Sequence, residues 1–347
     1  SGGRSGETPR ALRGFARESC LPVEISETLS EFDLIRTHFR GVGAHRPDVA
    51  LGVGDDSALL RVPSGLELAV SIDTLVCGVH FLPDCDPEAL GHKCLAVGLS
   101  DLAAMGAEPA WATLALTLPR RDEAWLHAFA QGFSSLAADH GVALVGGDTT
   151  RGPLSIAVQV HGLVPEGQGV RRSGARPGQL VCVSGTLGDA GLALRRLPAR
   201  ESVAEHQRVR LERPEPRDAL GMALRGDATA MIDLSDGLAA DLGHILEDSG
   251  VGAEIRLADL PLGSDVAEYV ARTGDWSVPV ASGDDSELCF TLPPERSSVL
   301  GGLARRSGCT VRVVGEVTRG TGLRCLLPDG ALWVPAEAGY NHFPGAG

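Results

Sequence analysis

The chain has 347 residues, a length that predicts two domains at about 150 residues each. Apolar residues make up 43% and charged residues 22% of the sequence, which excludes disorder for most of the chain and predicts buried cores. The 31 basic residues are outnumbered by 45 acidic ones, giving a formal net charge of −14. Since a nucleic-acid backbone would be repelled, we expect no such partner, and we expect phosphorylated ligands to be held through arginines, backbone N–H groups or divalent cations.

The eight cysteines are widely spaced and form no C-x-x-C pair, which favours reduced thiols and a cytoplasmic protein. No window reaches 18 consecutive apolar residues, and the first twenty residues lack the apolar segment of a secretion signal. We therefore expect a protein that neither crosses a membrane nor is secreted. Lys93 is the only lysine among the 31 basic residues. We attribute this to genomic base composition and predict no functional role for it.

Residues 1–29 lack periodicity and are predicted to be a flexible tail. After them, apolar and alternating runs predict strands, and two amphipathic stretches predict helices. The first helix begins at Asp86-Pro87-Glu88, an N-cap acid followed by proline, and runs to Gly106. The second begins at Asp122 and ends at Gly141. The predicted strands of this half are 49–53, 66–72, 111–118, 142–145 and 154–164.

Residues 165–178 are rich in glycine and proline and predict the domain junction, so that the two domains are 30–165 and 166–347. In the second domain helices and strands do not alternate strictly, which favours an α+β fold over a doubly wound sheet. Its predicted helices are 189–197, 217–224 and 238–249, and its predicted strands are 180–183, 253–257, 287–292, 311–317 and 323–327.

The common phosphate-binding, zinc, serine-hydrolase and dithiol motifs are all missing from the sequence. Instead, aspartate recurs beside glycine or serine, directly after an apolar run. The six sites are 54–56, 71–74, 100–101, 146–150, 233–237 and 283–285.

A single aspartate of this kind is most often a turn former or a helix N-cap. Six of them favour another interpretation, because carboxylates near small residues suit Mg²⁺ ions bound to a polyphosphate. Gly146, Gly147 and Gly237 would offer backbone N–H groups to phosphate oxygens, the last of them at the start of a helix.

Several segments closely resemble those of the thiamine-monophosphate kinase family in their order, their spacing and their amino-acid sequence. They separate this family from its superfamily relatives, aminoimidazole ribonucleotide synthetase and selenophosphate synthetase, and the match runs from about residue 31 to residue 343. The segments are 51–56 (LGVGDD), 73–76 (DTLV), 78–81 (GVHF), 93–107 (from Lys93 through LSDLAAMGA), 146–153 (GGDTTRGP), 172–175 (RSGA), 232–238 (IDLSDGL) and 339–343 (GYNHF).

The resemblance implies a two-domain α+β fold in which the N-terminal mixed sheets of two subunits pair into a barrel-like interface. It implies transfer of a phosphate from ATP to thiamine monophosphate, giving thiamine diphosphate and ADP. By position it implies Mg²⁺ ligands at Asp56, Ser71, Asp73, Asp101, Asp148, Asp233 and Asp236. It places ATP contacts at Gly147, Asp148, Arg172 and Ser235, and thiamine phosphate contacts at His80, Asp284 and Tyr340. Asp148, Arg172 and Asp236 would then carry the chemistry.

This chemistry needs no general base, because a phosphate monoester with a second pKa of about 6 is already an anionic nucleophile at neutral pH. Catalysis becomes positioning and charge neutralisation by Mg²⁺ and an arginine. Asp55 precedes a metal-ligand position and could be a ligand itself or support one. Plainer roles remain open for the other candidates: Arg172 as a solvated loop residue, His80 as a buried histidine and Tyr340 as a staple for the chain end.

Three positions depart from the family pattern. Ile72 replaces a hydroxyl residue, Ser282 replaces a glycine and Ser286 replaces a tyrosine. Two alternatives therefore stay open: another ATP-dependent enzyme of the superfamily, acting on a ribonucleotide or on selenide, and a non-catalytic nucleotide-binding protein. Retention of all six matched aspartates argues against the second, since they repel one another unless cations are bound.

Overall fold

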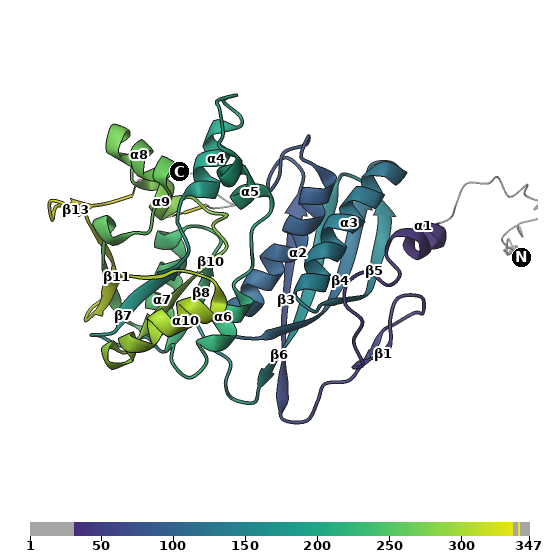
Figure 1. Ribbon diagram of the computed structural model, residues 1–347, viewed down its shortest axis with the longest axis horizontal. Helices are drawn as coiled ribbons and strands as arrows, with labels where there is room; N and C mark the ends of the chain where they lie inside the picture. Colours follow the sequence, from purple (N-terminus) through teal and green to yellow (C-terminus); the bar gives the residue numbers. More distant parts are fainter. Residues whose placement is uncertain (1–30, 336–338, 341–347) are drawn as a thin grey trace, which may run out of the picture.

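The computed structural model describes residues 31–335 and 339–340, so the predicted tail at 1–29 lies outside the described residues. Two β-sheets, each with its own helices, lie side by side (Figure 1). Within the described ranges, no helix is both long enough and apolar enough to cross a membrane. The α+β class predicted from the sequence is confirmed.

The first sheet is mixed and has four strands in the order β3-β6-β4-β5. Only the β4/β5 pair is parallel. A short hairpin and a first helix precede the sheet in the chain. The elements of this half are α1 (Glu31–His38), β1 (Val49–Leu51), β2 (Leu59–Leu60), β3 (Leu66–Val76), α2 (Pro87–Ala104), β4 (Glu108–Leu118), α3 (Glu123–Asp139), β5 (Ala143–Arg151) and β6 (Ser155–Pro165).

Helices α2 and α3 pack together on one face of this sheet (Figure 1). Both begin as their sequences predict, because Asp86 accepts a hydrogen bond from Glu88 N and Asp122 accepts one from Trp125 N. Their backbones approach closely at Gly91, where an added Cβ would lie 2.0 Å from Phe129 O. Only glycine permits this contact, and the contact fixes α2 against α3.

The other face of the sheet carries apolar side chains that nothing in the described chain covers. On the edge strand β3, Leu68 is 44%, Val70 49% and Ile72 63% exposed. Alternation places these residues on the face opposite the buried Leu75. A monomer would leave this apolar stripe in water.

The second sheet has seven strands in the order β13-β12-β9-β11-β7-β10-β8, and only β12 and β9 are parallel. Its strands are β7 (Leu180–Ser184), β8 (Ala230–Leu234), β9 (Gly252–Arg256), β10 (Glu287–Leu292), β11 (Val311–Thr318), β12 (Gly322–Leu326) and β13 (Leu332–Trp333). The helices of this half are α4 (Asp189–Arg196), α5 (Glu205–Glu212), α6 (Asp218–Ala223), α7 (Leu238–Ser249), α8 (Ser264–Thr273), α9 (Ser277–Ala281) and α10 (Leu300–Ser307), with 3₁₀ turns at Leu257–Asp259 and Pro294–Val299.

Helix α2 also packs against the second half, through α6 and β8. At Gly221 in α6 an added Cβ would lie 2.0 Å from Ala103 O, so the two backbones touch. Ala103 and Ala104 belong to the same apolar cluster as Leu220 and Phe290 of the second half. One helix therefore connects the two sheets, and it carries Asp101 of the site described next.

Candidate active site

Three aspartates from three different elements form a carboxylate cluster where the two sheets meet, in which Asp233 is buried and Asp73 and Asp101 are half-buried. Asp73 lies on β3, Asp101 on α2 and Asp233 on β8. The Ser71 hydroxyl donates a hydrogen bond to Asp101 and thereby joins β3 to α2. All four residues were predicted as metal ligands, and the fold brings them together from distant parts of the sequence.

Burial raises the pKa of all three carboxylates in this cluster. Burial, followed by the charge of Asp101, raises the pKa of Asp73 to about 6. Burial also raises the pKa of Asp101, against the opposing effects of the Ser71 hydrogen bond and the Arg172 charge. Burial and then Asp101 raise the pKa of Asp233 well above its ordinary value. The cluster is therefore short of positive charge.

The donor set fits Mg²⁺. Asp73 Oδ2 is buried and has no hydrogen-bond partner within the described chain, which leaves an oxygen free for a cation. In the described ranges no three His, Cys, Asp or Glu side chains converge on a single metal position. Since Mg²⁺ in kinase sites is usually held by one or two carboxylates together with substrate phosphates, a full protein cage is not required.

Asp56 and Asp148 lie apart from this cluster, along an open hollow of about 990 Å³ beside β5. Asp55, Gly146 and Gly147 also line it. An added Cβ at Gly147 would lie 1.9 Å from Leu114 O on β4, so this glycine is required by the close approach of two strands. Six of the seven predicted ligands thus form two groups in this structure, and the seventh, Asp236, lies in the loop after β8.

The loop after β8 holds Ser235 and Asp236, and its conformation is fixed by a residue that the sequence analysis missed. Asp241 Oδ2 accepts hydrogen bonds from the backbone nitrogens of Ser235, Asp236 and Gly237 at 3.0, 3.1 and 3.0 Å. Burial, followed by the charge of Asp236, raises the pKa of Asp241 to about 7. The Gly237 N–H is therefore engaged by Asp241, and the prediction that it binds phosphate is wrong.

The Asp284 loop lies against the Ser235 loop. Asp284 N donates to Ser235 O and Ser286 N donates to Leu234 O, both at 2.9 Å. Asp284 and Ser286 have positive φ angles of 67° and 51°, a conformation that aspartate tolerates better than most residues.

Ser282, where the family has glycine, has φ −84° and ψ 138°, which any residue adopts. Loss of that glycine therefore does not restrict the backbone.

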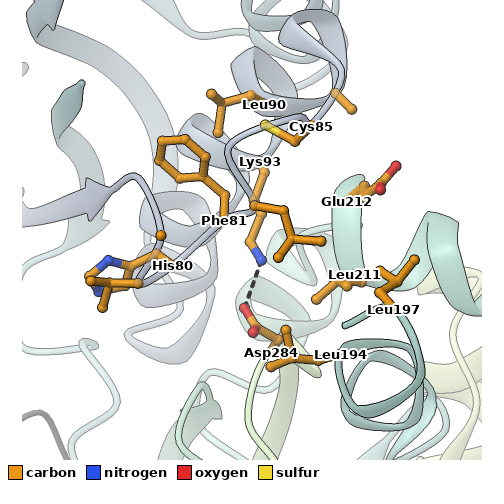
Figure 2. Close-up of a pocket in the computed structure, with 14 residues that line it drawn as sticks. His80, Phe81, Cys85, Leu90, Lys93, Leu194, Leu197, Leu211, Glu212 and Asp284 are labelled. Carbon is orange, nitrogen blue, oxygen red and sulfur yellow. Dashed lines mark ion pairs between the residues drawn. The ribbon is translucent and has the colours of Figure 1, made fainter. Parts of the chain in front are cut away.

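Asp284 faces a cavity of about 180 Å³ between the two halves of the molecule, and Lys93 forms an ion pair with it (Figure 2). His80 also lines this cavity, and its Nδ1 accepts a hydrogen bond of 3.0 Å from Val76 N. In the neutral ring the hydrogen is then on Nε2. The two predicted substrate contacts, His80 and Asp284, thus line one cavity.

Tyr340 N donates to Asp236 O at 3.2 Å, which places this residue beside the Ser235 loop, with its side chain 51% exposed. Arg172 is exposed in the junction loop, close enough to Asp101 for its charge to lower the pKa of that carboxyl. Both residues therefore lie at the edge of the site.

Comparison with known proteins follows the same division into two halves. Residues 54–164 match the family model of the AIR synthase related protein N-terminal domain, and residues 176–327 match that of the C-terminal domain. A thiamine-monophosphate kinase of Escherichia coli strain K12 is 46% identical over 318 residues, which cover 90% of this chain and 98% of the relative. The chain belongs to the thiamine-monophosphate kinase family. A family member from Bacillus subtilis is 34% identical over 91% of this chain and 100% of its own length.

Solved structures of the thiamine-monophosphate kinase family agree with this assignment. The enzyme from Stenotrophomonas maltophilia aligns with a TM-score of 0.78 at 44% identity, over 83% of this chain and 93% of the other. AaThiL complexed with AMPPCP and TMP aligns with a TM-score of 0.72 at 32% identity, over 84% and 92%. A hydrogenase maturation protein HypE, at 20% identity, shares the fold. The family and fold predicted from the sequence motifs are confirmed.

Proposed function

We propose that this chain transfers the γ-phosphate of ATP to thiamine monophosphate, forming thiamine diphosphate and ADP. The observation that carries the proposal is the 46% identity over 98% of a thiamine-monophosphate kinase. The relative that aligns in complex with AMPPCP and TMP supports both ligands. The arrangement of the site supports the same reaction, because a cavity lined by His80 and Asp284 lies beside the loop that holds Ser235 and Asp236.

The chemistry follows from the charges of the reactants. The acceptor phosphate is an anion at neutral pH and attacks the γ-phosphorus in line, so no side chain has to remove a proton. The obstacle is repulsion between two anions. Arg172 would neutralise charge on the transferred group, and Gly147 and Ser235 would position the nucleotide.

We infer that Mg²⁺ ions bound at the site neutralise and orient the phosphates. Asp73, Asp101 and Asp233, with Ser71, would hold them on the buried side. Asp56, Asp148 and Asp236 would hold them on the side of the nucleotide. Among these aspartates, Asp148 and Asp236 would lie closest to the transferred phosphate. Arg172 would also lie beside it.

The two halves would divide this work. We assign the binding of ATP and Mg²⁺, and dimerisation, to residues 30–165. We assign closure over the substrate to residues 166–347, which include Tyr340. A homodimer is supported by the apolar stripe on β3, which a second copy would cover. We place the enzyme in the cytoplasm, because ATP is available there and the seven described cysteines are free thiols.

One assay tests the function directly. ADP release is measured with a coupled system, offering thiamine monophosphate, thiamine and an aminoimidazole ribonucleotide precursor in parallel. We expect turnover with thiamine monophosphate alone. Turnover with the ribonucleotide would instead identify another enzyme of the superfamily, and ATP binding without turnover of any acceptor would identify a nucleotide-binding protein.

A further inference from the structure

The cavity between the two halves is lined mostly by apolar side chains and by a few charged ones. Apolar side chains from both halves form most of the lining, among them Phe81 and Leu90 from the first half and Leu194 and Leu211 from the second (Figure 2). Such a wall suits a flat heterocyclic ring. The charged side chains that face the cavity are Lys93, Glu212 and Asp284.

Lys93 extends from α2 across the domain interface to Asp284 (Figure 2). Its Nζ lies 2.9 Å from Asp284 Oδ1. Lys93 is only 5% exposed, although lysine is among the residues that are almost never buried without a partner. This ion pair is therefore unlike those on the surface, where water and salt weaken the attraction.

The ion pair engages Oδ1 of Asp284 and does not use Oδ2. The Asp284 side chain is 32% exposed, so it is still reached from the cavity. Its backbone is held by the hydrogen bond to Ser235 O, and its side chain is held by Lys93. A carboxylate fixed in this way has a defined direction in which it accepts hydrogen bonds.

We propose that Lys93 is a positioning residue for the acceptor: it orients the Asp284 carboxylate toward the heterocyclic end of the substrate. The inference rests on the proposed function. Thiamine monophosphate has two rings. Its pyrimidine carries an amino group that donates hydrogen bonds, and its thiazolium ring is cationic. Either group is recognised by a carboxylate in an apolar pocket, while Lys93 itself need not contact the ligand.

The position of Lys93 on α2 gives this role a structural basis. Asp101 of the carboxylate cluster lies on the same helix, eight residues later, a rise of about 12 Å. A single rigid element therefore carries the residue that orients Asp284 and a predicted ligand of the phosphate-bound metal. Displacement of the Asp284 side chain alone would weaken binding of the ring without disturbing the phosphate end.

The test is steady-state kinetics with Lys93→Met, Lys93→Arg, Asp284→Asn and the double variant Lys93→Met/Asp284→Asn. For Lys93→Met we expect the KM for thiamine monophosphate to rise about tenfold, while kcat and the KM for ATP change by less than about twofold. Lys93→Arg should restore most of the lost affinity, because it keeps the charge. The double variant should match Asp284→Asn alone, since Lys93 acts through Asp284.

Arg213→Met is the matched control. Arg213 pairs with Asp86 at 3.2 Å and Glu88 at 3.4 Å across the same interface, but it does not line the cavity. We expect its acceptor KM to be unchanged. An equal rise in this variant would mean that loss of any interdomain ion pair has the same effect, and would overturn the proposal.

Other outcomes are equally decisive. An unchanged acceptor KM in Lys93→Met, or effects that add in the double variant, would overturn the role of Lys93 while wild-type turnover of thiamine monophosphate would still support the proposed function. If the wild type did not use this acceptor, the proposed function itself would fail. If Lys93→Met did not fold, the double variant would be compared with Asp284→Asn, since neither of them leaves a carboxylate unpaired. Equal KM values for the acceptor would support the proposal, and a higher KM in the double variant would overturn it.

Discussion

The Asp241 carboxylate lies 3.0 Å from the backbone nitrogen of Gly237, four residues earlier in the chain. The same oxygen also accepts hydrogen bonds from Ser235 and Asp236, so one side chain fixes the loop that joins β8 to α7. Asp236 is a proposed metal ligand and Ser235 a proposed nucleotide contact. Their geometry therefore depends on a residue that touches neither ligand.

The first prediction follows from this contact. Asp241→Ala removes the acceptor of three backbone N–H groups, and we expect kcat/KM to fall between about tenfold and a hundredfold and the free energy of unfolding to fall by about 1–3 kcal/mol. Asp241→Asn keeps an acceptor oxygen and should lose much less. Kinetics and urea unfolding measure both effects. Wild-type activity in Asp241→Ala would show that the loop needs no such support.

The second prediction concerns metal dependence. The orphaned oxygen of Asp73, and the raised pKa values of Asp73 and Asp233, which burial and the charge of Asp101 cause, indicate that a cation is needed before the anionic nucleotide binds well. Calorimetry should detect ATP binding with Mg²⁺ and a collapse of affinity in EDTA. Asp148→Asn should lower kcat at least about a hundredfold with little change in stability. Equal ATP affinity with and without Mg²⁺ would contradict the role proposed for the metal.

The third prediction is a pH dependence of stability. His140 at the end of α3 pairs with Asp218 of α6 at 3.1 Å, and so joins the two halves. Burial is the largest single effect and lowers the pKa of His140. The hydrogen bond to Asp218 and the charges of Asp218, Asp139 and Glu215 together outweigh burial, so that the pKa lies above the usual 6.5. Because the folded state binds this proton more tightly, the contribution is complete below pH 6.5 and is lost as pH rises through the folded-state pKa.

The measurement compares wild type with His140→Gln in urea unfolding across this pH range. The variant should be less stable by about 1 kcal/mol at low pH, and the difference should shrink as pH increases. His127→Gln, an exposed position on the same helix, is the control and should show no such trend. A difference that stays constant with pH would exclude protonation of His140 as its cause.

The fourth prediction is that the apolar stripe on β3 is a dimer interface. Val70→Glu places a charge in the middle of the stripe, and burial of that charge would oppose association. Light scattering at micromolar concentration should give twice the monomer mass for wild type and a shift toward monomer for the variant. Leu332→Glu, at a position that is 56% exposed on β13, is the matched control and should leave the mass unchanged. An active wild-type monomer would rule out a required dimer.

The elements that the sequence predicted well are those whose signals are local. Helices α2 and α3 each begin at an aspartate N-cap and bury an apolar stripe, and both were predicted to within a few residues. Strand β8 was missed, although it carries Asp233, because a buried run of five residues has no periodicity to distinguish it. Helix α5, Glu205–Glu212, was missed because five of its eight residues are charged or histidine and its stability comes from packing against α4.

The same limit applies to the site. The metal-ligand set could be predicted from aspartates beside small residues and from the family motifs, because both signals lie in short stretches of consecutive residues. Lys93 was attributed to base composition and given no role of its own, although it begins one of the family segments. Only the fold brings it to 2.9 Å from Asp284, which lies in the other half of the chain. Asp241 was missed because a polar residue in the first turn of a helix is normally solvated. Contacts between distant residues, and between loop and helix, leave no pattern in the sequence.

The fifth prediction concerns the charge of the acceptor. If transfer occurs directly between phosphates, thiamine monophosphate reacts as an anion, and kcat/KM should fall as pH decreases below about 6, where its second proton returns. Unphosphorylated thiamine should not react at any pH, because its hydroxyl would need a base. Among the aspartates of the six recurring sites, the two without an assigned ligand role are Asp55 and Asp285. Asp55 Oδ1 accepts a hydrogen bond from Asp56 N, which is a local turn contact.

Asp285 does not suit the role of a base. Both of its oxygens accept hydrogen bonds from Gly188 N, at 2.9 and 3.1 Å, and the residue is only 2% exposed and does not line the cavity. Asparagine keeps its shape and an acceptor oxygen, so Asp285→Asn should reduce kcat much less than Asp148→Asn. Comparable turnover of plain thiamine, or a loss in Asp285→Asn as deep as in Asp148→Asn, would mean that a base takes part and that direct transfer to an anionic phosphate is not the mechanism.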